Sequence, residues 1–204
     1  MTDVPVLGEY EYGFKDDAKI LFSTGKGLNE EVIRTISREK QEPQWMLDFR
    51  LKAYQTFKEK PVAKWGVDLS ELNFDDYIYY LRANDRPART WDEVPDKIKE
   101  TFDRLGVPEA ERAFLAGTSV QYESETVYSR MKDQVDQLGI IFTDTDTALK
   151  EYPELFKKYF ATVVHPGENF QTALNSACWS GGSFIYIPKG VKVDMPLQAY
   201  FRLN

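Results

Sequence analysis

The chain has 204 residues, with 33 acidic and 26 basic side chains, a net charge of −7, one Cys and one His. Its hydrophobic content of 42% is too high for a disordered chain, and its acidity excludes a non-specific nucleic-acid binder, which needs clustered Lys and Arg. A single Cys excludes an internal disulfide, and one Cys with one His cannot build a zinc site from Cys and His ligands alone.

Residues 1–160 have mainly helical patterns. Apolar side chains recur at helical spacing over 28–36, and Asn29 is placed to cap this helix ahead of two carboxylates. Pro43 opens a second helix, which ends before Pro61, and Arg50 lies off its apolar face. That apolar face is formed by Trp45, Met46, Phe49, Ala53 and Phe57.

The other elements predicted before residue 160 are helices with two short strands among them. In chain order they are a short aromatic helix over 75–81, a helix over 94–105, a helix from Pro108 to Gly117, a strand over 119–122, a helix over 125–138, a short strand over 140–142, a helix over 148–152 capped by Thr145 or Asp146, and its continuation from Pro153 to Phe160.

The charge distribution changes sharply near residue 160. Only five charged side chains lie in residues 161–204, and all the others lie in residues 1–160. After Ala161, β-branched and aromatic runs separated by turns predict strands over 183–187, 191–194 and 198–203. We therefore expect an α+β chain with a helical N-terminal domain at 1–160 and an incomplete β domain at 161–204. Short, evenly spaced strands suit a sandwich, a barrel or a β-solenoid. The last strand stops at the end of the chain, so the sequence looks cut off.

Cys178 is the candidate reactive residue, because a thiol can serve as a nucleophile or as a ligand for sulfur or metal. Its surroundings faintly resemble the Cys-Trp signature of papain-like peptidases, but these enzymes carry their catalytic His far downstream, whereas His165 lies upstream. The simpler interpretation is a buried or partly buried structural thiol. His165 itself lies in a predicted turn before Pro166 and Gly167, and a surface or hydrogen-bonding role is the simpler one there.

Several long blocks of sequence carry a family resemblance. The main block runs from Ala173 to Asn204 and contains Asn175-Ser-Ala-Cys-Trp-Ser-Gly-Gly-Ser-Phe-Ile-Tyr-Ile-Pro-Lys-Gly190. Three further blocks lie at residues 27–40, 42–53 and 122–128. Together they closely resemble the SufB family, the scaffold proteins of the SUF iron–sulfur cluster assembly system, over nearly the whole chain.

The resemblance implies a fold, partners and a function. The fold is a helical N-terminal region followed by the start of a right-handed parallel β-helix. The partners are a SufC-like ATPase, a SufD-like paralogue and a sulfur-donor desulfurase system. The function is that of a scaffold on which a nascent iron–sulfur cluster is assembled, with ATP hydrolysis belonging to the partner, so the chain is not expected to be an enzyme.

Two departures from the family limit what the resemblance implies. Family chains are considerably longer, and the Cys, His and Glu residues implicated in cluster assembly lie beyond Asn204, so no cluster is expected on this chain alone. Cys178 occupies a position where an aliphatic residue is common, which favours packing over chemistry. A SufD-like structural partner without cluster chemistry, and a thiol enzyme using Cys178, stay open as alternatives.

No membrane or nucleic-acid partner is expected. No apolar run approaches the roughly 20 residues needed to span a bilayer. The first residues also show neither the basic nor the apolar region of a secretory signal. We therefore expect a cytoplasmic location.

Overall fold

A computed structural model gives the structure of the chain. It describes residues 20–65, 67–83, 94, 96–104, 117–122, 125–131, 137–194 and 196–202. The elements in chain order are β1 (Phe22–Ser23), α1 (Glu30–Glu39), α2 (Gln44–Glu59), the 3₁₀ turn η1 (Phe74–Asp76), β2 (Leu81–Arg82), α3 (Asp96–Arg104), β3 (Gly117–Tyr122), β4 (Glu125–Met131), β5 (Ile141–Asp144), α6 (Thr145–Glu151), α7 (Pro153–Tyr159), α8 (Phe170–Cys178), β6 (Ser183–Tyr186) and β7 (Leu197–Arg202).

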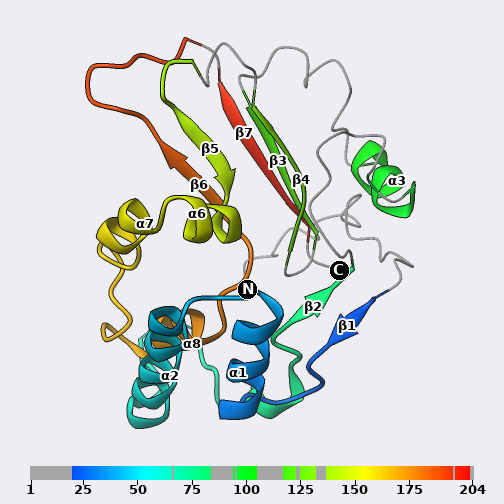
Figure 1. The fold of residues 1–204 in the computed structure, drawn as a ribbon. Helices are drawn as coiled ribbons and strands as arrows, with labels where there is room; N and C mark the ends of the chain where they lie inside the picture. The colour runs from blue at the N-terminus through cyan, green and yellow to red at the C-terminus, as the bar shows by residue number, and fades with distance from the viewer. Residues whose placement is uncertain are drawn as a thin grey trace, which may run out of the picture.

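Helices α1, α2 and α8 pack together at one end of the molecule (Figure 1). α1 begins as predicted after Asn29, whose side chain accepts a hydrogen bond from the Val32 N–H at 2.9 Å. α2 begins after Pro43, also as predicted. α8, which the strand prediction for residues after 161 missed, lies against α2 and also touches α1.

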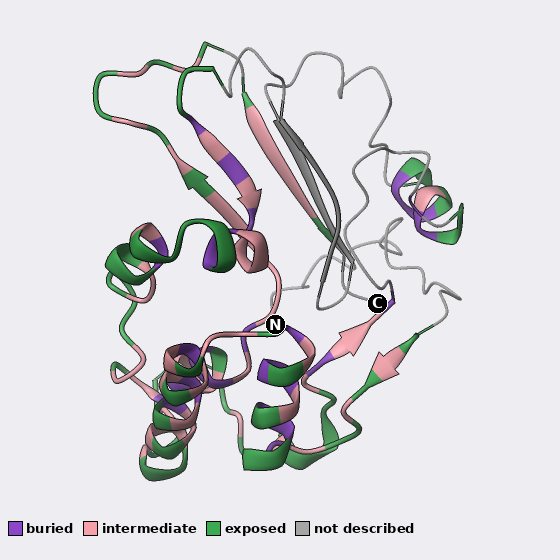
Figure 2. Ribbon diagram, viewed as in Figure 1, coloured by how far each residue is buried: buried purple, intermediate pink, exposed green. Residues whose placement is uncertain are grey.

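Two apolar clusters hold the helices together. One joins α1 and α2 to α8, and its buried members are Leu28, Val32, Ile33, Ile36, Ala53, Tyr80 and Ala177. The other joins α2 to α6, α7 and the segment after α8, and its buried members are Met46, Ala148, Leu149, Phe156 and Trp179. Figure 2 shows buried positions in α1 and α2, each beside exposed turns of the same helix, as expected for amphipathic helices.

The strands form three small sheets. β3 is the central strand of a three-stranded sheet, in which it pairs antiparallel with β4 and parallel with β7. β5 pairs antiparallel with β6, with Ile141 opposite Tyr186, and β5 also lies beside β3 and β4 (Figure 1). β1 and β2 form a separate antiparallel pair. Elements on both sides of residue 160 therefore share sheets, and the proposed division into 1–160 and 161–204 stays a prediction.

Several local predictions need correction. Residues 125–131 form strand β4 and not the start of a helix, because they pair along their length with β3. The predicted aromatic helix over 75–81 is only the turn η1, followed by β2. Residues 191–194 form no regular strand, although Val191 and Val193 pack against Ile140.

The remaining predictions fit or lie outside the described residues. The helix predicted over 94–105 is present as α3. The segment 105–116, which includes most of the helix expected from Pro108, lies outside the described residues. Within the described part of the chain, no helix is both long enough and apolar enough to cross a membrane.

Candidate functional site

The candidate site surrounds the α8–β6 junction, which we define as residues Ala177–Gly182. Its position depends on α8, which begins with a capping box. The Asn169 side chain accepts a hydrogen bond from the Thr172 N–H at 2.9 Å, and the Asn169 N–H donates to Thr172 Oγ1 at 3.1 Å. These two bonds give partners to the backbone N–H groups of Asn169 and Thr172 and fix the first turn of the helix.

Arg50 holds the end of α8 from the side of α2. Its side chain and that of Glu42 are fully buried, and Arg50 Nε and Nη2 donate to the two Glu42 carboxylate oxygens at 2.8 and 2.6 Å. Arg50 Nη1 donates to the Ala177 carbonyl at 3.1 Å, and the guanidinium lies 4.5 Å from the centre of the Trp179 ring. A guanidinium is suited to this place because its planar fork can bind a carboxylate and stack on a ring together.

The chain turns from α8 into β6 through two glycines. Gly181 and Gly182 have φ values of 61° and 134°, which residues with a Cβ rarely adopt. A Cβ on Gly182 would lie only 3.1 Å from Thr145 Cγ2. The Gly182 carbonyl accepts a hydrogen bond from the Thr145 N–H at 3.1 Å, which joins the start of α6 to the junction.

Cys178 is partly buried and lies on the side of the junction that faces α1 and α2. It packs against the cluster built on α1 and α2, and its thiol donates to the Leu174 carbonyl at 3.1 Å. Burial raises the pKa of Cys178 to about 11, although the nearby Arg50 charge lowers it in part. At that pKa only about one thiol in ten thousand is ionised at pH 7.

His165 is in the exposed loop between α7 and α8, where its Nδ1 accepts a hydrogen bond from the Gly167 N–H at 3.0 Å. His165 and Cys178 make their hydrogen bonds to different partners and do not contact each other in the described part of the chain, so the structure gives a Cys-His pair no support. Asp144, and not Thr145 or Asp146, is the N-cap of α6, because its side chain accepts from the Thr147 N–H at 2.8 Å. In the described ranges no three His, Cys, Asp or Glu side chains are grouped as metal ligands would be.

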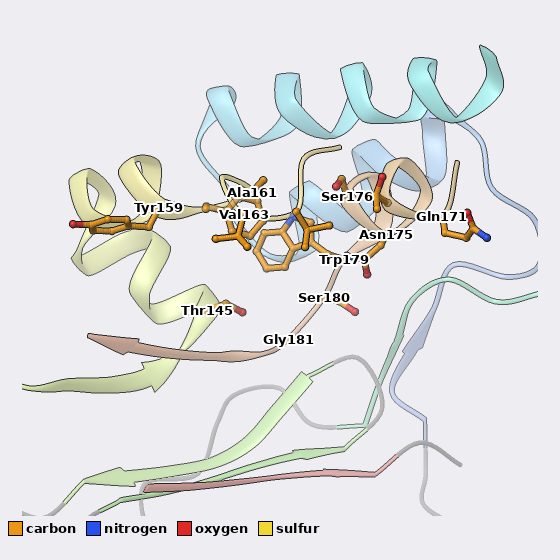
Figure 3. Close-up of a pocket in the computed structure, with 13 residues that line it drawn as sticks. Thr145, Tyr159, Ala161, Val163, Gln171, Asn175, Ser176, Trp179, Ser180 and Gly181 are labelled. Atoms are coloured by element: carbon orange, nitrogen blue, oxygen red, sulfur yellow. The ribbon is translucent and has the colours of Figure 1, made fainter. Parts of the chain in front are cut away.

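A cavity of about 550 Å³ lies on the other side of the junction (Figure 3). Its wall comes from the first residue of α6, the end of α7, the loop after α7, α8 and the junction. In Figure 3 Trp179 lies between Tyr159 at one end and Gln171 at the other. Neither Cys178 nor His165 lines this cavity.

Three lining residues hold buried polar atoms that have no hydrogen-bond partner within the described part of the chain. They are Thr145 Oγ1, Gln171 Oε1 and Trp179 Nε1. The main sequence block contained Trp179, but no block reached Gln171, Val163 or Val164, which line the same cavity from α8 and the α7–α8 loop. The α7–α8 loop and α8 line the same cavity because of tertiary packing, which a local sequence pattern does not predict.

The chain is similar to proteins of one family over most of its length. The family described as "SufBD protein N-terminal region" matches residues 93–199. The chain is 58% identical over 200 residues to iron–sulfur cluster assembly SufBD family proteins of Staphylococcus aureus (strain USA300) and Staphylococcus haemolyticus (strain JCSC1435). These alignments cover 98% of this chain and 43% of each relative, so the chain spans less than half the length of the curated relatives it matches.

Proposed function

The chain belongs to the SufBD protein family, and on that premise we propose that it takes part in iron–sulfur cluster assembly as a scaffold and not as an enzyme. The identity of 58% over 200 residues with relatives named for this process carries the proposal. The surroundings of Cys178 support it, because a partly buried thiol whose pKa is raised lacks the features of an enzymatic nucleophile.

More specifically, we propose a SufB-type scaffold, which the block from Trp179 to Gly182 favours over its paralogue. Such a scaffold would act in the cytoplasm with a SufC-like ATPase and a SufD-like paralogue, and would take sulfur from a desulfurase system. The iron–sulfur cluster is its cargo. The thiolate, imidazole or carboxylate ligands of that cargo would come from the parts of SufBD proteins that this chain does not match.

The proposed fold is an α+β arrangement in which the strands near the C-terminal end begin a right-handed parallel β-helix. The parallel pairing of β3 with β7, in register from Gly117 and Leu197 to Tyr122 and Arg202, supports this, because repeats of such a solenoid stack on their neighbours. An experimental structure of the chain bound to its partners would test the proposal. We expect it to show another strand in parallel contact with β7, and only antiparallel strands there would contradict it.

Co-purification tests the assembly role. A tagged SufBD protein that carries this sequence at the full length of the matched relatives is co-expressed with the SUF ATPase and the paralogous subunit of the same organism, and the complex is incubated with iron and sulfide. We expect the three proteins to elute together at a constant ratio and the complex to gain the absorption of thiolate-bound iron. Separate elution, or a complete complex that gains no such absorption, would contradict the proposal.

Cys178→Ala provides the matched control for the thiol-enzyme alternative. If the thiol is only structural, a strain whose only copy of the protein carries Cys178→Ala keeps the activity of its cluster-dependent enzymes. Loss of that activity in a variant that still folds and still enters the complex would favour thiol chemistry instead.

The SufD-like alternative is separated from the SufB-like one by where the cluster is held. A SufD-like chain would stabilise the complex while all cluster ligands came from the paralogue. If the chain is SufD-like, replacing the cysteines of the paralogue, one at a time, removes the absorption of thiolate-bound iron from the complex completely. If the chain is of the SufB type, the complex keeps this absorption.

A further inference from the structure

The wall of the cavity beside the α8–β6 junction holds buried hydrogen-bond donors and acceptors that have no partner among the described residues. Trp179 is 9% exposed, and its Nε1–H has no acceptor in the described part of the chain. Gln171 Oε1 and Thr145 Oγ1 are likewise buried without a partner there. A buried donor or acceptor left unpaired is costly, so groups of this kind mark a place where a partner is expected.

The wall of the cavity selects an uncharged occupant. Among the described residues that line it there is no Asp, Glu, Lys, Arg or His. Phe160, Ala161 and Trp179 provide apolar surface, and Ser176 and Ser180 add neutral polar groups. A charge placed here would lose its hydration without gaining a counter-ion. An amide beside an apolar side chain meets all these conditions, because it offers a carbonyl to Trp179 and an N–H to Gln171.

The mouth of the cavity indicates that the occupant is a polypeptide and not a small molecule. Val163 and Val164 line the mouth and are 93% and 57% exposed. A small molecule held inside would leave Val163 in water, whereas a bound segment crossing the mouth would cover both valines. Figure 3 shows the lining residues spread from Tyr159 to Gln171, which suits an extended segment.

A lysine side chain places a positive charge at the Tyr159 end of the cavity. Lys158 Nζ lies 5.0 Å from the centre of the Tyr159 ring, and Lys158 forms no ion pair with any described residue. We propose that the cavity docks an extended polypeptide segment of a partner protein, with an uncharged apolar side chain inside and a carboxylate near Lys158. This docking role does not depend on the proposed role in cluster assembly.

Selection of peptides from a random library tests the proposal. Dodecapeptides are displayed and selected on the full chain, with counter-selection on the Val163→Asp variant, and the dissociation constants of synthetic winners are measured by fluorescence anisotropy. We expect winners that share an apolar residue with an acidic neighbour. Their affinity should fall at least tenfold with Val163→Asp and severalfold with Lys158→Glu, and should not change with Val67→Asp, a matched valine that is 81% exposed outside the cavity.

The indole N–H of Trp179 reports occupancy directly. Its NMR signal is assigned by its absence from Trp179→Phe, and we expect it to shift when a winning peptide binds. Three outcomes would overturn the proposal. The selection could enrich no peptide over the counter-selected variant. Winners could bind without shifting this signal. N-acetyl-leucinamide alone could shift it as fully as a peptide, insensitive to Lys158→Glu, which would assign the cavity to a small molecule.

Discussion

The buried pair of Glu42 and Arg50 gives the sharpest prediction about stability. We expect Glu42→Gln to lower the free energy of unfolding by about 3–5 kcal/mol, because it leaves the guanidinium buried without its counter-charge. Gln has nearly the same shape as Glu, so packing is preserved and the electrostatic loss is isolated. A domain of this size is stable by only about 5–15 kcal/mol, so the variant would lie near the limit of folding.

The magnitude follows from the contacts of Arg50. Its Nε and Nη2 bind the two Glu42 oxygens at 2.8 and 2.6 Å, and in Gln one of these oxygens becomes an NH₂ group that faces an N–H donor. One charge-assisted hydrogen bond, about 1.5–3 kcal/mol, is therefore lost. The remaining cost is that of the uncompensated charge, because the bond to the Ala177 carbonyl and the contact with the Trp179 ring stay in place.

Urea unfolding followed by circular dichroism measures this cost. The matched control is Glu30→Gln, which breaks an exposed pair with Arg34 at 3.6 Å and should change stability by less than about 1 kcal/mol. The double variant Glu42→Leu with Arg50→Met removes both charges and should recover much of the loss. A cost below about 1 kcal/mol for Glu42→Gln, or a double variant no more stable than the single one, would show that the Glu42 charge is not needed to compensate the buried Arg50.

Three further predictions concern α8, the loop before it and the thiol. Asn169→Ala removes the capping box and should lower the free energy of unfolding by about 1 kcal/mol, measured by urea unfolding. Ala161 has a φ of 56°, in the left-handed region, so Ala161→Gly should raise stability by about 0.5–1 kcal/mol in the same assay. The pKa of Cys178 rises on folding from 9.0 to about 11, so its contribution to stability is complete below pH 9 and is lost as the pH rises through 11.

Each of these predictions has its own control. Asn175→Ala, at an exposed position of α8, should cost much less than Asn169→Ala. Ala173→Gly, in the buried interior of α8, should destabilise by about 1 kcal/mol or more, opposite in sign to Ala161→Gly. Cys178→Ala should flatten the stability profile between pH 9 and 11, and an unchanged profile would contradict the account of the thiol. Tyr79, whose pKa burial raises to about 12, adds its own loss only above pH 10.

The features predicted correctly from sequence are those fixed by neighbouring residues. Asn29 caps α1 because its side chain needs to reach only the Val32 N–H, and Pro43 precedes α2 because its fixed φ suits the residue before a helix. The capping box of α8 is equally local, and Asn169 with Thr172 could have revealed this helix. The low charge of residues 161–204 hid it, because a buried helix and buried strands have the same composition.

The errors arise where distant residues decide the structure. Residues 125–131 fit a helical spacing, but Thr126, Val127 and Tyr128 are strand formers, and pairing with β3 settles the outcome. Arg50 lies off the predicted apolar face of α2 and yet is completely buried, because Glu42 neutralises it and α8 covers it. Glu42 lies only eight residues before Arg50 in the sequence. The bond from Arg50 to the Ala177 carbonyl, 127 residues away, could not be predicted from the residues near Arg50.

The α8–β6 junction sends successive residues into different surroundings. Cys178 packs against the cluster of α1 and α2, whereas Trp179 is part of the cluster that contains α6 and α7. Ser180 and Gly181 line the cavity. Arg50 binds the backbone of Ala177 and stacks on Trp179, so it orients one wall of the cavity as well as the end of α8. Loss of its counter-charge should therefore disturb the cavity before it unfolds the protein. Under conditions where Glu42→Gln is still folded, we expect peptide affinity to fall together with a shift of the Trp179 indole signal, whereas unchanged affinity would show that the cavity is held by its other walls.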